Sequence, residues 1–286
     1  MTHRSRRAAA ALFTCALAVC AACLRTDDLV FLAPRTDHYR FPQNVVPPAQ
    51  LEQRTLITED GVRLAAVLAL QAAPAMTSTV LYLHGQAADI DDAWPDVQRL
   101  WGAGFNVFVV DYRGFGMSAG EPSEAGLYAD ARAAFSAVAS DPRLDPIRIV
   151  IWGFSMGTGV ASELALHAPG ALLVLEAPFT SMTAMVESSS PYGIPGDWFT
   201  SLRLDTAGRI ADVPVPLLVL RGGEDQRIPA WMPEEVFARA RDPKRLLDVA
   251  DAGHGEILGR AAGEVVAAMA ALVPSVAPGP APITPP

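Results

Sequence analysis

One serine of this chain stands where it could act as a nucleophile. Gly153-Phe154-Ser155-Met156-Gly157 follows an apolar run and precedes a stretch of helix-forming composition. Between a strand and a helix, G-x-S-x-G predicts a tight turn that exposes the serine hydroxyl. The N–H of Met156 would then face the position where an oxyanion forms. The motif by itself is weak evidence for a nucleophile, because a glycine-rich turn without any catalytic role can have the same sequence pattern.

A serine needs a general base, and His254 is the best placed of five histidines. It follows the last predicted strand, in a loop from which it could reach a serine on another strand. The other four fit other roles. His3 leaves with the amino terminus, His38 lies in a proline-rich segment, His84 would brace a loop, and His167 ends the helix after Ser155, where a cation is favoured.

The base needs an orienting carboxylate, and Asp225 is the candidate that we prefer. It follows a predicted strand in Arg221-Gly222-Gly223-Glu224-Asp225. Glu224 and Glu176 are rivals, and Asp251 is better explained as a turn former. The order Ser155, Asp225, His254 over successive strand ends is that of one known triad arrangement. In such a triad the aspartate orients the imidazole, and the imidazole takes the serine proton.

Composition excludes several other kinds of chemistry. The 286 residues carry a net charge of -9, which argues against nucleic-acid binding. All three cysteines lie within the first 23 residues, so the folded body has no cysteine for a disulfide, a zinc site or a nucleophile. The single lysine, Lys244, lies in an Asp-Pro-Lys-Arg turn, which makes lysine-based catalysis a poor fit. We expect no metal and no organic cofactor.

The candidate residues require a parallel sheet to bring them together. Residues 56–58 and 62–70 predict a hairpin around Asp60-Gly61. Continuous apolar runs, typical of strands buried on both faces, then alternate with helical stretches such as 123–139. These runs are 80–83, 106–110, 147–152, 172–175, 215–220 and 246–249. We therefore predict an α/β fold with a mainly parallel sheet of about eight strands, helices on both faces, and chemistry at the carboxyl ends of the strands.

The amino terminus has the layout of a secretory signal peptide. Arg4, Arg6 and Arg7 precede an apolar run that extends to Leu24 and is broken only by Thr14. Ala21-Ala22-Cys23 fits the end of a bacterial lipoprotein signal, which predicts export and a lipid on Cys23. Cys20 is the second choice, and an ordinary cleaved signal or an uncleaved anchor remains an alternative. Removing the three arginines changes the net charge from -9 to -12.

The chain therefore divides into four parts. We assign residues 1–22 to the signal peptide and 23–50, with four prolines, to a tether or an arm laid over the surface. Residues 51–273 form the single folded domain. Residues 274–286 contain six prolines and predict an extended, mobile tail.

Residues 51–273 resemble the α/β-hydrolase-fold serine hydrolases. Leu83-His84-Gly85-Gln86 is similar to the oxyanion loop of that family, and the resemblance implies that the N–H of Gln86 acts with that of Met156. Residues 111–118 resemble the D-x-R-G-x-G-x-S loop, where we expect backbone shaping. Residues 120–123 and 127–130 resemble the small-lid branch, which includes acyl-protein thioesterases and serine aminopeptidase-like proteins.

A lid insertion at residues 177–214 would decide the substrate. Its large apolar side chains could line an acyl pocket or simply pack the lid onto the body; they are Phe179, Met182, Met185, Tyr192, Trp198 and Phe199. We predict an exported, membrane-tethered serine hydrolase that cleaves carboxylic ester or thioester bonds of small or lipid-like apolar acyl substrates. The alternatives are a serine aminopeptidase, for which Glu187 and Asp197 are candidate grips, and a non-catalytic envelope lipoprotein.

Overall fold

The computed structural model describes residues 27–32, 34–168, 170–190 and 194–276, so the predicted signal peptide and Cys23 lie outside the described residues. Its centre is one eight-stranded sheet with the order β1-β2-β4-β3-β5-β6-β7-β8. Strands β1 and β2 run antiparallel to their neighbours, and all later pairs are parallel. The strands are β1 Leu51–Ile57, β2 Arg63–Ala69, β3 Thr79–Leu83, β4 Asn106–Val110, β5 Ile149–Phe154, β6 Leu172–Glu176, β7 Leu217–Gly222 and β8 Lys244–Val249.

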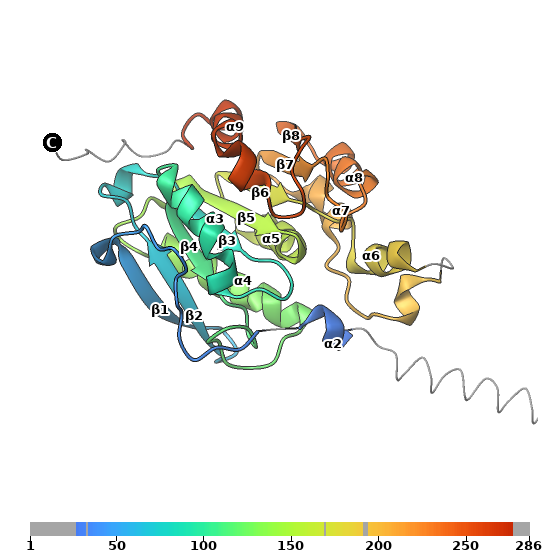
Figure 1. Cartoon of the computed structure of the whole chain (residues 1–286), viewed down its shortest axis with the longest axis horizontal. Coiled ribbons are helices and arrows are strands. Elements are labelled where there is room, and N and C mark those ends of the chain that lie inside the picture. Colours follow the sequence, from blue (N-terminus) through green and yellow to red (C-terminus); the bar gives the residue numbers. More distant parts are fainter. Residues whose placement is uncertain (1–26, 33, 169, 191–193, 277–286) are drawn as a thin grey trace, which may run out of the picture.

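Helices cover both faces of the sheet, as Figure 1 shows. On one face lie α3 (Ile90–Gly102) and α9 (Ile257–Leu272), and on the other lie α4 (Glu124–Ala139), α5 (Met156–His167) and α8 (Trp231–Arg239). The shorter helices are α2 (Asp27–Val30), α6 (Met182–Ser189) and α7 (Thr206–Arg209). The 3-10 turns span Pro48–Gln50, Pro74–Met76, Pro146–Arg148, Gly196–Trp198 and Ile210–Asp212. This arrangement confirms the predicted α/β-hydrolase fold.

Strand β5 shows why the predicted strands read as continuous apolar runs. Ile149 and Ile151 pack into the cluster under α4 and α5, whereas Val150 and Trp152 pack into the cluster under α3 and α9. All four side chains are fully buried. A strand with both faces covered has no polar face, so its sequence does not alternate.

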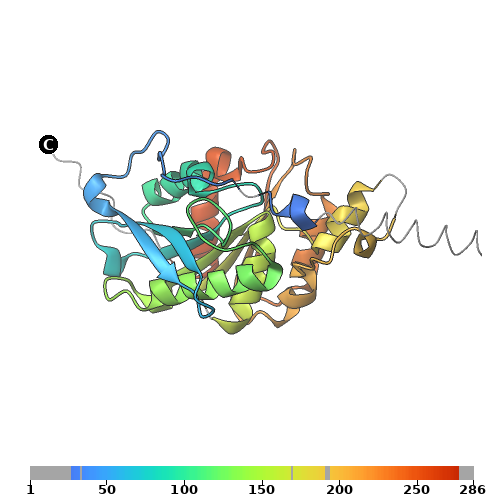
Figure 2. The same ribbon diagram turned by 90° about the horizontal axis from the view of Figure 1, so that it is seen from below.

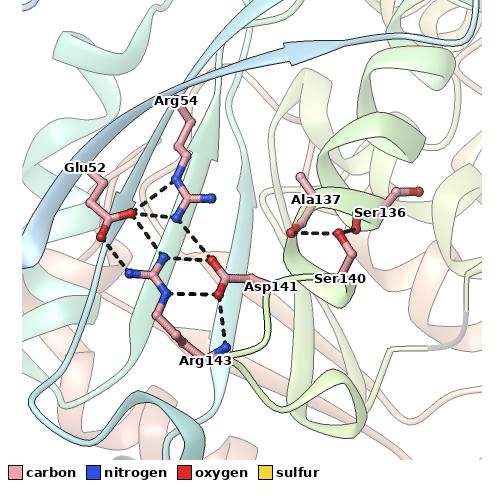
Figure 3. A network of polar contacts seen from close by, with 7 residues as sticks. All are labelled: Glu52, Arg54, Ser136, Ala137, Ser140, Asp141 and Arg143. Carbon is pink, nitrogen blue, oxygen red and sulfur yellow. Dashed lines mark hydrogen bonds and ion pairs between the residues drawn. The ribbon is translucent and has the colours of Figure 1, made fainter.

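The edge strand β1 is held to the turn after α4 by a network of charged side chains (Figure 3). Arg143 donates to Glu52 at 2.6 Å and to Asp141 at 2.8 and 3.0 Å, and Arg54 bonds to the same two carboxylates. Hydrogen bonds from Arg143 and Arg54 lower the pKa of Glu52 to about 2. The network fixes the position of an edge strand whose sequence mixes apolar residues with charged and polar ones.

Residues 34–50 lie along the body as an arm. The Thr36 N–H donates to the Gly116 carbonyl at 3.2 Å, and the Tyr39 hydroxyl reaches the buried carboxylate of Asp111. The Phe41 ring lies 4.7 Å from the Trp94 ring, and Val46 is almost fully buried. At the other end, packed structure continues past 273 to Val276, which is fully buried. Every helix in the described ranges is too short or too polar to cross a bilayer.

Candidate active site

Ser155 occupies a strained turn between β5 and α5. Its backbone has φ 50° and ψ -116°, in the region with positive φ that residues other than glycine rarely adopt. The Ser155 N–H donates to the Glu176 carbonyl at 2.9 Å, and the Ser155 carbonyl accepts from the Thr158 N–H at 2.9 Å. Both neighbours hold the turn in place, and strain of this kind is found at functional sites.

Glycine is required on both sides of this turn. A Cβ on Gly157 would lie 2.1 Å from the Leu83 carbonyl oxygen, and one on Gly153 would lie 2.4 Å from the Gly157 carbonyl oxygen. Helix α5 therefore begins in direct contact with the end of β3. The two glycines of the motif allow this close approach, as their spacing predicts.

His254 and Asp225 form a hydrogen-bonded pair. The His254 Nδ1 lies 2.8 Å from Asp225 Oδ2, and the two side chains are only 11% and 5% exposed. The other carboxylate oxygen accepts from the N–H groups of Arg227 and Ile228 at 2.8 and 3.0 Å. Partial burial raises the pKa of Asp225, but the hydrogen bonds from His254 and Ile228 outweigh it and leave this pKa below its ordinary value. The pair therefore holds a carboxylate against the imidazole.

The loops that carry this pair are joined through their backbones. The Gly223 N–H donates to the Val249 carbonyl at 2.9 Å, and the Glu224 N–H donates to the Ala252 carbonyl at 3.0 Å. The rival carboxylates have other surroundings. Glu224 is exposed, Asp251 pairs with Arg260 at 3.3 Å, and Glu176 is buried and accepts from the Trp152 indole at 3.0 Å.

The Phe154 ring lies between the serine loop and the histidine loop. Its centroid is 5.0 Å from that of His254. A Cβ on Gly85 would lie 3.1 Å from this ring and 3.4 Å from the Ser155 Cβ. In the described ranges no hydrogen bond joins the Ser155 hydroxyl to His254, a bond that often tightens only when substrate is bound. Only its position inside G-x-S-x-G could have pointed to Phe154.

The two expected oxyanion donors are in turns next to Ser155. Gln86 follows Gly85 in the turn between β3 and α3, and Met156 is the first residue of α5. First-turn N–H groups have no acceptor within their own helix and are available to an anion. The contact of Gly157 with the carbonyls of Leu83 and His84 holds the Gln86 turn against the serine turn.

The predicted lid residues have different environments. Phe179 and Met182 are buried in the cluster that includes α4 and α5, and Met185 packs against that cluster. Phe199 is half-buried, whereas the Trp198 side chain is 64% exposed. The candidate Tyr192 lies outside the described residues. The buried members pack the lid onto the body, whereas Trp198 is exposed and does not contribute to this packing.

Two side chains set aside as non-catalytic have structural contacts. His84 is buried against the Tyr112 ring, with its Nδ1 2.9 Å from the Gly85 carbonyl, and burial lowers its pKa to about 4. Lys244 donates to the Phe237 and Ala240 carbonyls and so caps α8. Among the residues that the structure describes, no cluster of three or more His, Cys, Asp or Glu side chains could hold a metal ion.

The loop at residues 111–118 shapes the backbone beside the site. The Asp111 carboxylate accepts from the Ile90 N–H at 2.9 Å, and Arg113 bonds to Asp60 and Asp130. Burial raises the pKa of Asp111 to about 7. The contacts agree with the expectation that these residues position the chain.

The sheet order, the strained serine turn and the loops that meet above it define an α/β-hydrolase. A family model described as serine aminopeptidase, S33, matches residues 74–203. An uncharacterized protein of Mycobacterium tuberculosis is 38% identical over 70% of both chains, and the uncharacterized protein YfhR of Escherichia coli K12 is 31% identical over 82% of this chain and 86% of its own. The chain therefore belongs to this family of α/β-hydrolases.

A solved structure supports the same fold. The esterase Pf2001 of Pyrococcus furiosus superimposes with a TM-score of 0.67 over 84% of this chain and 95% of its own, at 19% identity. At that identity the likeness establishes the fold alone.

Proposed function

We propose that this protein is an exported serine hydrolase that cleaves carboxylic ester or thioester bonds of apolar acyl substrates. The observation that carries the proposal is the 2.8 Å contact between His254 Nδ1 and Asp225, in a loop that packs against the strained Ser155 turn. A Ser-His-Asp triad consists of a serine, an imidazole and a carboxylate that bonds to the imidazole Nδ1. Ser155, His254 and Asp225 would supply these three parts.

The proposed reaction passes through an acyl-enzyme. The Ser155 oxygen attacks the acyl carbonyl carbon while the His254 Nε2 accepts the hydroxyl proton, and Asp225 stabilises the resulting imidazolium. The N–H groups of Gln86 and Met156 hold the oxyanion. Collapse breaks the bond to the alcohol or thiol, which leaves with the proton from His254. Water then attacks the acyl carbon in the same way and releases the carboxylic acid and free Ser155.

The experiment that tests this proposal measures hydrolysis of p-nitrophenyl butyrate. The variant His254→Gln should lower kcat by about 10⁴-fold or more, the range of losses that removal of a triad member causes. His167→Gln is the matched control, because His167 is exposed and its imidazole lies 3.7 Å from Glu163. Equal losses in both variants, or none in either, would contradict the proposed role of His254.

Aminopeptidase activity is the second candidate, favoured by the description of the matching family model. The candidate grips for a peptide amino terminus do not form a free carboxylate pair: Asp197 bonds to Arg203 at 3.1 Å, and Glu187 is exposed. We therefore rank ester cleavage first. A rate on amino-acid p-nitroanilides above that on p-nitrophenyl butyrate would reverse the order.

We also propose that a lipid on Cys23 tethers the mature protein to a membrane of the cell envelope. The support is the sequence Ala21-Ala22-Cys23 after an apolar run. Mass spectrometry of the mature amino terminus tests this, since diacylglyceryl-modified Cys23 should be its first residue. An unmodified terminus, or one that starts at Cys20, would contradict it.

A further inference from the structure

The first described residue of the chain is bound to the lid. The Asp27 carboxylate accepts hydrogen bonds from the Thr200 hydroxyl at 2.6 Å, the Ser201 N–H at 2.9 Å and the Ser201 hydroxyl at 2.6 Å. Hydrogen bonds to a charged group are roughly twice as strong as neutral ones. Both views of the molecule place α2 beside the lid (Figures 1 and 2).

The segment after Asp27 is fixed as well. Val30 is buried in the core cluster that also contains Leu202, and Phe31 packs against this cluster. The Gly116 N–H then donates to the Pro34 carbonyl at 2.7 Å, and Arg35 donates to the Ser118 carbonyl at 2.9 Å. The place where the amino-terminal segment leaves the body is therefore set by the lid.

Two large apolar side chains close in sequence to the residues of this contact are exposed. Trp198 precedes Thr200 by two residues and is 64% exposed, and Leu32 follows Asp27 by five residues and is 56% exposed. On the lid, Arg203 and Asp197 form an ion pair at 3.1 Å. We call Leu32, Trp198 and the Asp27–Ser201 contact the lid face. Tryptophan is favoured where an apolar ring can lie at the level of lipid headgroups.

The proposed lipid anchor lies only four residues before Asp27. Four residues span at most about 14 Å. The polar region on each side of a bilayer is roughly 5–8 Å thick. An acyl chain on Cys23 would therefore hold the lid face at the membrane surface and leave the opposite end of the sheet in solvent.

We propose that the lid face rests on a phospholipid surface and that the protein takes acyl esters from that surface. This inference rests on the proposed function and on lipidated Cys23. It identifies the substrate class as membrane-resident ester lipids. The lid follows β6 at the carboxyl end, where Ser155 lies, so a lid held at the bilayer brings the serine turn toward lipid carbonyls.

The first test measures contact with lipid directly. The full-length lipidated protein is incorporated into phosphatidylcholine vesicles that contain brominated lipid, and quenching of tryptophan fluorescence is recorded. Quenching should be present in the wild type and be lost in Trp198→Phe. It should persist in Trp231→Phe, a control because Trp231 on α8 is also exposed. Quenching that persists in Trp198→Phe, or protein that fails to float with the vesicles, would overturn the proposal.

The second test compares two substrates. Asp27→Ala removes the three hydrogen bonds to Thr200 and Ser201. It should lower hydrolysis of vesicle-embedded ester lipid by roughly tenfold or more, since a single hydrogen bond to a charge already corresponds to about that factor, and leave p-nitrophenyl butyrate hydrolysis unchanged. Asp37→Ala is the control, since Asp37 is an exposed carboxylate on the arm at residues 34–50 and pairs with His38. If the ratio of the two rates is unchanged in Asp27→Ala, the inference is contradicted. If the wild type hydrolyses neither substrate, the proposed function is contradicted. The quenching experiment tests the lid face in either case.

Discussion

His254 Nδ1 lies 2.8 Å from Asp225 Oδ2, although 29 residues separate the two along the chain. Backbone bonds between the loops after β7 and β8 hold them together. If this carboxylate orients the imidazole, Asp225→Asn should fold normally and lower kcat for p-nitrophenyl butyrate by about 10⁴-fold, because an amide favours the wrong tautomer. Glu224→Gln is the matched control, since Glu224 is the exposed neighbour. Near-normal turnover in Asp225→Asn would show that another carboxylate orients the base.

The close contact at Gly157 predicts a loss of stability. Gly157→Ala would place a Cβ 2.1 Å from the Leu83 carbonyl oxygen, so the free energy of unfolding should fall by about 3 kcal/mol or more. In Gly263→Ala, an exposed position on α9 with nothing within 4 Å of the new Cβ, it should rise by about 0.5–1 kcal/mol. Urea unfolding measures both changes. A tolerated alanine at position 157 would mean that α5 does not abut β3 as described.

The buried carboxyl of Glu176 predicts a dependence of stability on pH. Burial and the nearby Asp96 raise the pKa of Glu176 from 4.5 to about 8. One oxygen of the Glu176 carboxyl group accepts a hydrogen bond from the Trp152 indole N–H. The folded chain therefore holds this proton more tightly than the unfolded chain. Stability from this group is full below pH 4.5 and is lost as the pH rises through about 8.

Glu176→Gln removes this titration and keeps an acceptor for Trp152. The variant should unfold at higher urea than the wild type at pH 9, and the difference should shrink toward pH 5. Asp96 and Arg99, the other charged groups near Glu176, are present in both proteins, so their contributions largely cancel. A difference that does not change with pH would show that Glu176 does not titrate in this window.

The charged network on β1 predicts a smaller, salt-sensitive effect. Arg143→Ala should lower the free energy of unfolding by about 1 kcal/mol at low ionic strength, and less in 1 M salt. Arg143 and Arg54 lower the pKa of Glu52 to about 2. The difference in stability between wild type and Arg143→Ala should therefore be present above about pH 4.5 and shrink as the pH falls toward 2. Arg241 pairs with Asp212, and both side chains are exposed, so Arg241→Ala should lower the free energy of unfolding by less. Equal effects would mean that the network adds nothing to an isolated surface pair.

Much of the sheet could be predicted from the sequence because its central strands are buried on both faces. Strand β4 has the predicted bounds, Asn106–Val110. Strand β5 begins two residues later than predicted, because Ile147 lies in a 3-10 turn and is 77% exposed. Strand β1 begins at Leu51, well before the predicted hairpin arm, because pairing with β2 and the Glu52 network outweigh its polar sequence.

The candidate site was predictable only in part. Strand ends suggested the candidates Ser155, Asp225 and His254, because the carboxyl ends of parallel strands meet at one edge, and the structure brings Asp225 and His254 within 2.8 Å of each other. The position of Phe154 inside G-x-S-x-G was its only sequence signal, and the contact between Asp27 and Ser201 had none. Residues that are 174 positions apart show no periodicity that relates them, so such contacts emerge only when the chain is folded.

The central claim is that Ser155 is the nucleophile, and labelling with a fluorophosphonate tests it most directly. The probe should react with the wild-type protein, and mass spectrometry should place the phosphonyl group on the peptide that contains Ser155. Ser155→Ala should remain unlabelled, while Ser162→Ala, which removes a buried α5 hydroxyl bonded to the Gly159 carbonyl, should label like the wild type. Equal labelling of the wild type and Ser155→Ala would contradict this account.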